Sequence, residues 1–525
     1  MADVKKVLMV TPEFYGDTMV GGLAMAVSGL SNSLMQLGMD VAVMMPCYAK
    51  SGEAETYTRE PFATKGGLVV HETEVNGIKI YKVSGINPGL IEPQKGSVQQ
   101  KQESVEFDFQ YVPDINDSAH TGIYSSHMDK KRFHALLRFA NAVPRAMEKA
   151  NLKPDVIHLH EWTSASASFF LRNLWYPQTN KIPVVLTTHN ANYSGTIPDM
   201  NETPEDMQNR FAHLNHILGS HISAGNRVFT SLLELGSEYS DFLTTVSPTE
   251  AQEILAGREG INPRVLEVFK RKGLEGILNG LDPDVFNPIN DELIERFNPQ
   301  NPDEVSEAKK ANKRRFTTLY SEKYKTRRRQ VNLDPDKMWI TMMCRLTNQK
   351  GIYQTVYALR ERFGINTAQL LIIGDPLNSD VKAHVESLGR SVFTHTCFAK
   401  PELQHLALAA SDAILQPSRY EPFGYTQIEG MAYGALPIVT DVGGHHDTIQ
   451  FYNGDNGYGF KIQDLSTKSI NNAINNAEQA YQNQGLWKEL IQRAVKEDFT
   501  WLGPRGSAKK YLSHYMRLIE AAEKK

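Results

Sequence analysis

Short apolar runs alternate with helical patterns along most of this chain, and this alternation restricts the fold to a few architectures. The first run covers residues 7–10, and Gly21-Gly22 then precedes apolar residues at helical spacing. Gly38 follows the end of this predicted helix, where a terminating glycine is typical, and the next run covers residues 41–45. A strand–helix–strand unit of this kind predicts a parallel sheet with helices on both faces.

The same pattern continues along the chain and then begins again. We predict further strands at residues 156–158, 184–187 and 242–246 in the first half, and at residues 339–343, 370–373, 413–416 and 436–440 in the second half. A chain of 525 residues is too long for a single hydrophobic core. The sequence therefore predicts an α/β protein with two Rossmann-like, doubly wound parallel-sheet domains that face a central cleft.

The repeat of the pattern also predicts the domain boundaries. We expect an N-terminal domain at residues 1–283, a C-terminal domain at residues 284–500, and a final helical segment at residues 501–525 that packs back on the N-terminal domain. The domains should close about a hinge at residues 282–288 and in the segment before the final helix.

Two polar stretches interrupt the pattern. Residues 88–117 are irregular and long for a loop, so we predict a surface insertion there. Residues 291–337 are highly charged and include the basic runs at 309–315 and 327–329. Such runs are most often solvated helix faces, and we favour this interpretation over a docking surface for a polymeric or anionic partner.

The composition argues against several classes of function. A net charge of −4 gives no general attraction to nucleic acid or to anionic membranes, and no apolar stretch is long enough to span a bilayer. The three cysteines are far apart, which argues against a disulfide framework and against a thiolate metal site. No apolar signal region precedes the first strand, so we expect a cytoplasmic protein, and homo-oligomerisation stays open.

Two glycine turns suggest anion binding. Gly21 and Gly22 lie between a strand and a helix, where backbone N–H groups can meet a ligand, although a pair of glycines is more often only a tight connection. Near the end of the second half, Gly424, Tyr425 and Thr426 begin a predicted helix whose free N–H groups suit a diphosphate.

Charged and polar residues surround these turns in the sequence. Glu421 and Glu429 flank the second turn and could grip the two ends of an extended ligand, or one could simply cap the helix. Arg345 and Lys350 directly follow a strand and could neutralise a departing diphosphate. His189 lies at the end of a strand, where open α/β sheets bind ligands, and we favour a functional role for it.

His158 and His160 are two residues apart on a predicted strand. This spacing places both side chains on one face, among packed residues, and no further cluster of metal ligands is near them in the sequence. We favour hydrogen-bonded core roles for both and predict no metal site.

Taken in order, these segments resemble the bacterial and archaeal glycogen synthase and plant starch synthase family. The resemblance spans nearly the whole chain, and it rests on the ordered set rather than on any single motif. The matching segments are residues 21–23, 158–162, 188–190, 245–249, 279–282, 345–351, 417–424 and 499–501.

The resemblance implies a GT-B fold and transfer of a hexose, with retention of configuration, from ADP-glucose or UDP-glucose to a glucan or another hydroxyl acceptor. It implies no metal ion and no cofactor besides the nucleotide sugar. Arg345 and Lys350 would neutralise the diphosphate, Gly21 and Gly22 would approach it from the opposite domain, and Glu421 would bind the donor sugar near its reacting end.

The resemblance assigns the remaining binding residues in the same way. His189 would hydrogen-bond a sugar hydroxyl, and Glu429 stands where related retaining transferases hold the ribose, although bacterial glycogen synthases often lack an acid there. Glu161 and Asn279 lie in matching segments and complete the predicted binding residues.

Three positions depart from the family pattern. Met19 replaces a lysine, Glu161 replaces an aspartate, and Thr163 replaces a histidine. All three belong to the acceptor side of the cleft, so nucleotide-sugar binding should be kept while the sugar or the acceptor could differ. The alternatives are therefore a related transferase with another acceptor or donor sugar, and a catalytically silent homologue. A phosphorylase would need a lysine-bound pyridoxal phosphate, for which we find no supporting segment.

Overall fold

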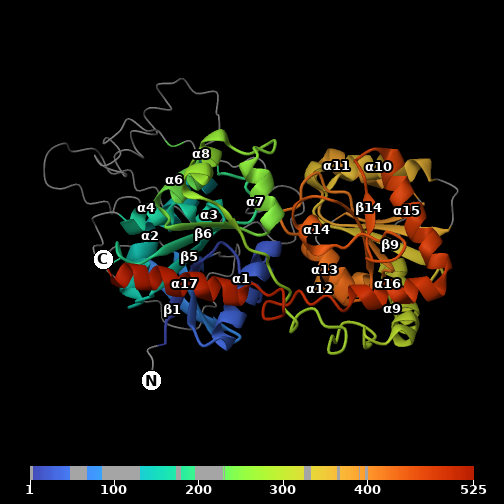
Figure 1. Ribbon diagram of the computed structural model, residues 1–525, viewed down its shortest axis with the longest axis horizontal. Helices are drawn as coiled ribbons and strands as arrows, with labels where there is room; N and C mark the ends of the chain where they lie inside the picture. Colours follow the sequence, from blue (N-terminus) through green and yellow to red (C-terminus); the bar gives the residue numbers. More distant parts are fainter. Residues whose placement is uncertain are drawn as a thin grey trace, which may run out of the picture.

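The computed structural model describes residues 4–19, 21–47, 68–84, 130–172, 179–195, 229, 231–323, 333–362, 367–389, 391–396 and 400–524. The predicted insertion at residues 88–117 and the basic run at 327–329 lie outside these residues. Two α/β units lie side by side, each with a central sheet between helices (Figure 1).

The N-terminal domain is built on a sheet with the strand order β3-β4-β2-β1-β5-β6-β7-β8. Neighbouring strands pair in parallel except β3 with β4, which are antiparallel. The strands are β1 (Lys6–Val10), β2 (Asp40–Pro46), β3 (Val69–Val75), β4 (Ile78–Ser84), β5 (Val156–His160), β6 (Val184–Thr188), β7 (Phe242–Thr245) and β8 (Glu275–Gly276). The helices include α1 (Gly22–Gln36), α2 (Lys130–Lys149), α3 (Trp162–Ala165), α4 (Ala167–Arg172), α6 (Leu232–Tyr239), α7 (Pro248–Leu255) and α8 (Pro263–Lys272).

The C-terminal domain has a parallel sheet with the strand order β11-β10-β9-β12-β13-β14. The strands are β9 (Met338–Met343), β10 (Ala368–Ile373), β11 (Val392–His395), β12 (Ala413–Gln416), β13 (Leu436–Thr440) and β14 (Phe460–Ile462). The helices include α9 (Pro302–Lys323), η3 (Asn348–Lys350), α10 (Ile352–Glu361), α11 (Ser379–Glu386), α12 (Pro401–Ala410), α13 (Tyr425–Ala432), α14 (Gly443–Thr448), α15 (Thr467–Gln482) and α16 (Gln484–Ala494).

Burial on both faces explains why the central strands are largely apolar. Val7 and Met9 of β1 pack into one hydrophobic cluster, whereas Leu8 and Val10 pack into the cluster on the opposite face. Successive side chains of a strand point to opposite faces, so a strand between two helical layers needs apolar residues at every position. The structure therefore confirms the predicted α/β architecture of two parallel-sheet domains.

The last helix, α17 (Ala508–Glu523), lies against the N-terminal domain (Figure 1). Tyr511, Tyr515 and Ile519 are buried in the same cluster as Val7 of β1. The Tyr515 hydroxyl is 2.6 Å from Nδ1 of His158, a buried residue of β5. The C-terminal segment thus completes the core of the domain in which the chain begins.

The two chain segments that cross between the domains are hydrogen-bonded to each other. The N–H of Leu281 donates to the carbonyl of Phe499 at 2.8 Å, and Leu281 forms a parallel bridge with Thr500. A Cβ atom on Gly280 would lie 2.6 Å from Cγ of Trp501, so a larger residue there would push the two segments apart. Both crossings therefore run together, which is the arrangement expected of a hinge.

The basic run at residues 309–315 corrects one prediction. Lys310 and Arg314 are exposed as expected, but Lys309 and Lys313 are buried on the inner face of α9. Lys309 Nζ donates to the carbonyl oxygen of Ser411, and Lys313 Nζ is 2.6 Å from a carboxylate oxygen of Asp412. The solvated-face interpretation is wrong for these two lysines, because residues four apart share a helix face and this face meets acceptors in the core. Burial lowers the pKa of Lys309 to about 7.

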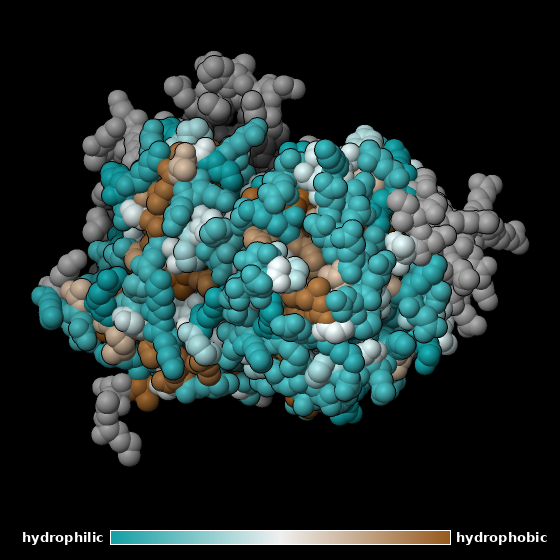
Figure 2. Space-filling view, turned by 45° about the vertical axis from the view of Figure 1, so that its right-hand side comes forward, coloured by the Kyte–Doolittle hydropathy of each residue, from teal (hydrophilic) through white to brown (hydrophobic). Residues whose placement is uncertain are grey.

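Hydrophilic residues cover most of the face shown in Figure 2, and hydrophobic residues reach its surface in small, separate patches. Among the described residues, no helix combines the length and the apolar character that a membrane span requires.

We predict that the two domains rotate relative to each other about the paired crossings at residues 280–282 and 499–501. A diphosphate bound between the domains would favour their approach, because both would contact it. Small-angle X-ray scattering without nucleotide, with ADP and with UDP should show a more compact particle with at least one nucleotide. Identical scattering in all three conditions, with nucleotide binding verified by calorimetry, would contradict the prediction.

Candidate functional site

The predicted site residues lie where strands of the two sheets end. Glu161 follows β5 and His189 follows β6 in the N-terminal domain, whereas Arg345 follows β9 and Glu421 lies in the loop after β12. Loops at the carboxyl ends of parallel strands are the usual ligand sites of open α/β sheets. All four residues therefore lie in loops at the carboxyl ends of parallel strands, where such sheets bind ligands.

Lys350 and Glu421 form an ion pair in the C-terminal domain. Lys350 Nζ lies 2.5 Å from Oε2 of Glu421, and the hydroxyl of Ser418 donates to the same oxygen at 2.9 Å. The Glu421 side chain is only 5% exposed. Although burial alone would raise the pKa of this carboxyl, the charge of Lys350 and the hydrogen bonds from Lys350 and Ser418 hold it below its ordinary value. Glu421 is therefore ionised at neutral pH.

His445 is a neighbour of this pair that the sequence analysis missed. Its Nε2 lies 4.0 Å from Oε2 of Glu421, and burial lowers the pKa of the imidazole to about 4. His445 belongs to α14, which begins with Gly443-Gly444 directly after β13. This is the same sequence signal, a pair of glycines between a strand and a helix, that singled out Gly21 and Gly22.

The glycines of α14 allow its backbone to pass close to the loop that carries Glu421. The N–H of Gly444 donates to the carbonyl of Glu421 at 2.7 Å. A Cβ atom on Gly443 would lie 2.1 Å from that same carbonyl oxygen, and Gly443 has φ of +45°. Only glycine fits such an approach.

Arg345 lies on the loop after β9, and its side chain is exposed. Burial raises the pKa of the adjacent Cys344 thiol to about 12. The charge of Glu421 also raises this pKa, whereas the charges of Lys350 and Arg345 lower it. The shared influence on Cys344 places Arg345 in the same charged surroundings as the Lys350–Glu421 pair.

The predicted helix start is present as α13. Gly424 is its N-cap residue, with φ of +80°, and has no side-chain cap. A Cβ atom on Gly424 would lie 2.3 Å from Oε1 of Gln427, so the tight turn requires glycine. The first helical residues are Tyr425 and Thr426, whose N–H groups belong to the orphan donors of a helix N-terminus. An anion would be stabilised at this point.

The start of α1 meets the start of α13 across the domain boundary. A Cβ atom on Gly22 would lie 2.9 Å from the ring of Tyr425. The N–H of Gly21 donates to Oε2 of Glu13 at 3.0 Å, so this donor is already used within the N-terminal domain. The structure thus brings the two predicted glycine turns together. It also shows a steric reason for Gly22, which the sequence could not reveal.

Glu161 organises the backbone on its side of the boundary. Oε1 accepts from the N–H of Trp162 at 3.0 Å, and Oε2 accepts from the N–H groups of His189 and Asn190, each at 3.0 Å. Glu161 adopts φ of +68° and is 3% exposed. Burial raises the pKa of its carboxyl to about 7, against the opposing effect of the backbone hydrogen bonds.

His189 is neutral at physiological pH, because burial lowers its pKa to about 3. Its Nε2 lies 3.2 Å from Nδ1 of His160, whose pKa burial also lowers well below the ordinary value. His158 lies between Tyr515 and Thr187, at 2.6 and 2.7 Å. The core roles expected for His158 and His160 agree with these contacts, and His189 can act only as a neutral hydrogen-bonding group.

Glu429 lies one helical turn after Tyr425 on α13 and is 3% exposed. Burial raises the pKa of its carboxyl to about 8, opposed by a hydrogen bond from Nε2 of Gln404 at 3.4 Å. The carboxyl is therefore mostly protonated at neutral pH in the absence of ligand.

The structure also places Asn279 and two of the three departures from the family pattern. Asn279 is 6% exposed, and its N–H donates to the carbonyl of Val246 at the end of β7. Met19 packs against the hydrophobic cluster of the C-terminal domain. Thr163 is 1% exposed on α3, and its hydroxyl lacks a hydrogen-bond partner within the described structure. Met19 thus makes an apolar contact where the family pattern has a lysine.

The described residues contain no group of three or more His, Cys, Asp and Glu side chains arranged as metal ligands. Arg345 and Lys350, together with the N–H groups at the start of α13, could face an anionic ligand.

Two family models match the chain. Residues 6–280 match the model described as starch synthase catalytic domain, and residues 323–496 match the model described as glycosyl transferases group 1. The boundary between the two matches lies in the region where the sequence pattern begins again.

Similar proteins align with the chain over nearly its full length. A glycogen synthase from Exiguobacterium sibiricum is 28% identical over 96% of this chain and 97% of its own. A glycogen synthase from Thermodesulfovibrio yellowstonii is 29% identical over 99% of each chain. Among solved structures, the catalytic domain of starch synthase IV from Arabidopsis thaliana, bound to ADP and acarbose, matches with a TM-score of 0.75 at 22% identity, covering 99% of this chain and 100% of that one. This likeness confirms the predicted GT-B fold.

We predict that Glu429 makes the free energy of unfolding depend on pH. Its folded-state pKa of about 8 lies above the ordinary 4.5, so the folded protein retains a proton that the unfolded chain loses. Stability should therefore fall as the pH rises from about 4.5 to about 8. Relative to Glu429→Gln, the wild type should lose on the order of a few kcal/mol over this range, measured by urea unfolding.

The exposed Glu520 provides the matched control, because Glu520→Gln should follow the wild-type pH profile. Parallel profiles for the wild type and Glu429→Gln would show that the buried carboxyl does not titrate in this way.

Proposed function

We propose that this chain, which belongs to the starch synthase catalytic domain family, transfers glucose from ADP-glucose or UDP-glucose to an α-1,4-glucan with retention of configuration. The family match confirms the resemblance found in the sequence, and the chain is a glycosyltransferase. The full-length alignment with two glycogen synthases supports a glucan acceptor rather than an unrelated one.

The observation that carries the proposal is the buried Lys350–Glu421 pair beside Arg345 and the start of α13. A nucleoside diphosphate that leaves a sugar gains negative charge, and preorganised cations with helix N–H groups stabilise such charge best when they are partly shielded from water. Lys350 is only 16% exposed, and its ion pair with Glu421 keeps it oriented before a ligand arrives.

Glu421 would then serve the sugar rather than the phosphate. Its contacts with Lys350, Ser418 and His445 all converge on Oε2. We therefore assign Oε1 to accept a hydrogen bond from a hydroxyl of the donor sugar, which fixes the anomeric carbon relative to the diphosphate.

In the proposed reaction, the bond between the anomeric carbon and the diphosphate oxygen breaks, and its electron pair leaves with the diphosphate. The acceptor hydroxyl attacks on the same face, and its proton passes to the departing phosphate oxygen. Arg345 and Lys350 supply the positive charge that stabilises the departing diphosphate. The reaction therefore requires only the nucleotide sugar and the acceptor.

The N-terminal domain would complete the sugar site. Neutral His189 can accept or donate a hydrogen bond to a sugar hydroxyl, and its ring position depends on His160. Both Glu161 oxygens already accept from backbone N–H groups. Glu161 therefore serves the sugar indirectly, because it shapes the loop that carries His189 and Asn190.

The proposed function is tested by nucleotide release from ADP-glucose and UDP-glucose, with and without glycogen. We expect release with at least one donor, stimulated by glycogen and accompanied by incorporation of glucose into the polymer. Release that glycogen does not stimulate would reject the glucan acceptor, and the absence of turnover with any sugar nucleotide would reject transferase activity.

Glu421→Gln keeps the size of the side chain but removes the charge that faces Lys350. We predict that kcat falls about 100-fold or more while the protein stays folded, measured by the same assay and by thermal unfolding. Glu489→Gln is the control, because Glu489 pairs with Arg493 on the surface of α16 and should leave kcat unchanged. Equal kcat values for Glu421→Gln and the control would remove Glu421 from the proposed mechanism.

A further inference from the structure

We propose that Arg258 is a positioning residue that reaches from the N-terminal domain to the ring of Tyr420 and thereby holds Glu421 in place when the domains meet. This inference rests on the proposed function, because it assigns Arg258 a part in the same transfer reaction. Arg258 lies three residues after the end of α7 and belongs to none of the motifs that pointed to the site.

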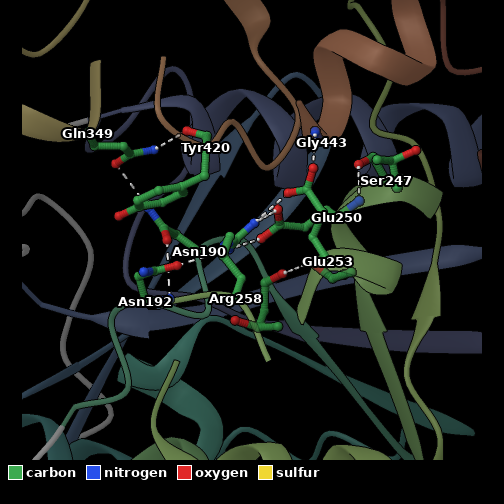
Figure 3. Close-up of polar contacts among 12 residues, drawn as sticks. Asn190, Asn192, Ser247, Glu250, Glu253, Arg258, Gln349, Tyr420 and Gly443 are labelled. Carbon is green, nitrogen blue, oxygen red and sulfur yellow. Dashed lines mark hydrogen bonds and ion pairs between the residues drawn. The ribbon is translucent and has the colours of Figure 1, made fainter. Parts of the chain in front are cut away.

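Arg258 is held rigidly within its own domain (Figure 3). Its guanidinium pairs with both oxygens of Glu250, one through Nη1 and the other through Nη2 at 2.8 Å. Nη1 also donates to Oε2 of Glu253 at 3.0 Å, and Nη2 donates to Oδ1 of Asn192 at 2.9 Å. The Glu250 side chain is fully buried and that of Arg258 is 13% exposed, so the fork is fixed by charge-assisted hydrogen bonds that water screens little.

The guanidinium faces a residue of the other domain. Its central carbon lies 4.6 Å from the centroid of the Tyr420 ring, within the range of cation–π attraction. Tyr420 directly precedes Glu421 in the loop after β12. A contact on the Tyr420 ring therefore acts on the peptide unit that carries the Glu421 side chain.

One acidic partner of Arg258, Glu253, contacts the start of α14, which is itself hydrogen-bonded to Glu421. Oε1 of Glu253 accepts from the N–H of Gly443 at 2.9 Å. The next residue, Gly444, donates its N–H to the carbonyl of Glu421 at 2.7 Å. Arg258 and Glu253 thus act on both sides of Glu421, one through the Tyr420 ring and the other through the start of α14.

Two further contacts join the domains at the same edge. Asp447 of α14 accepts from the N–H and the hydroxyl of Thr249, at 2.8 and 2.7 Å. Asn190 Nδ2 lies 3.4 Å from Oε1 of Gln349, whose Nε2 donates to the Tyr420 carbonyl at 3.3 Å. The bonds from Thr249 to Asp447 and from Asn190 to Gln349 each join one domain to the other, so they form only when the two domains are in contact.

The arrangement predicts how substitutions at the two positions should combine. Arg258→Lys keeps the positive charge but loses the planar fork, and Tyr420→Leu removes the aromatic ring. Each should lower kcat about tenfold while the KM for the donor changes little, because neither side chain supplies the charge that binds the diphosphate. The double variant should be no worse than the more damaged single variant, since both changes break the same contact.

Two variants separate this role from ordinary stabilisation. Tyr420→Phe keeps the ring and should retain more activity than Tyr420→Leu. Arg264→Lys is the matched control, because Arg264 pairs with Glu234 inside the N-terminal domain and should leave kcat unchanged. Losses at Arg258 and Tyr420 that multiply in the double variant, or a Tyr420→Phe variant as impaired as Tyr420→Leu, would overturn the proposal.

A measurement without substrate distinguishes failure of this inference from failure of the proposed function. Hydrogen exchange of the peptide covering residues 417–424 should be faster in Arg258→Lys than in the wild type and in Arg264→Lys. Faster exchange in a protein without transferase activity would uphold the positioning contact and reject the proposed function. Unchanged exchange in this peptide, with or without activity, would reject the positioning role of Arg258.

Discussion

The buried ion pair between Lys350 and Glu421 constrains the architecture around it. A carboxylate that is nearly excluded from water must have a cation and hydrogen-bond donors nearby, and Lys350 and Ser418 supply them from the ends of two adjacent strands. The loop after β12 must therefore bend toward the loop after β9. Gly443 is needed because the backbone of α14 passes within contact distance of that bent loop.

The N-terminal domain is organised by buried polar groups of a different kind. Glu161 draws the N–H groups after β5 and β6 toward one carboxylate, and the neutral pair of His160 and His189 lies beside it. The chemistry of the proposed reaction is thus divided between the domains. The C-terminal side supplies the cations Arg345 and Lys350, whereas the N-terminal side offers neutral His189 as a hydrogen-bonding group, which suits a diphosphate on one side and a sugar hydroxyl on the other.

The sequence predicted well the features that depend on a local pattern of residues, namely the central strands and the glycine turns. Apolar runs located the central strands of both sheets because strands buried on both faces are largely apolar, whereas β3, β4, β8, β11 and β14 at or beside the sheet edges were not predicted. Glycine pairs located turns because other residues are excluded there. Lys309 and Lys313 were predicted wrongly, because their acceptors at Ser411 and Asp412 lie about a hundred residues further along the chain. Arg258 was missed for the same reason, since its proposed positioning role depends on the ring of Tyr420 in the other domain.

By itself, the sequence determined the two-domain α/β architecture, the family, and the side chains that carry charge at the strand ends. Periodicity and short motifs suffice for these, because each depends on residues that are neighbours along the chain. Only the tertiary structure decided which oxygen of Glu421 is occupied, that Gly22 makes room for Tyr425, and that the Glu161 carboxylate serves backbone N–H groups. These outcomes depend on distances between segments that meet only after both domains have folded and come together.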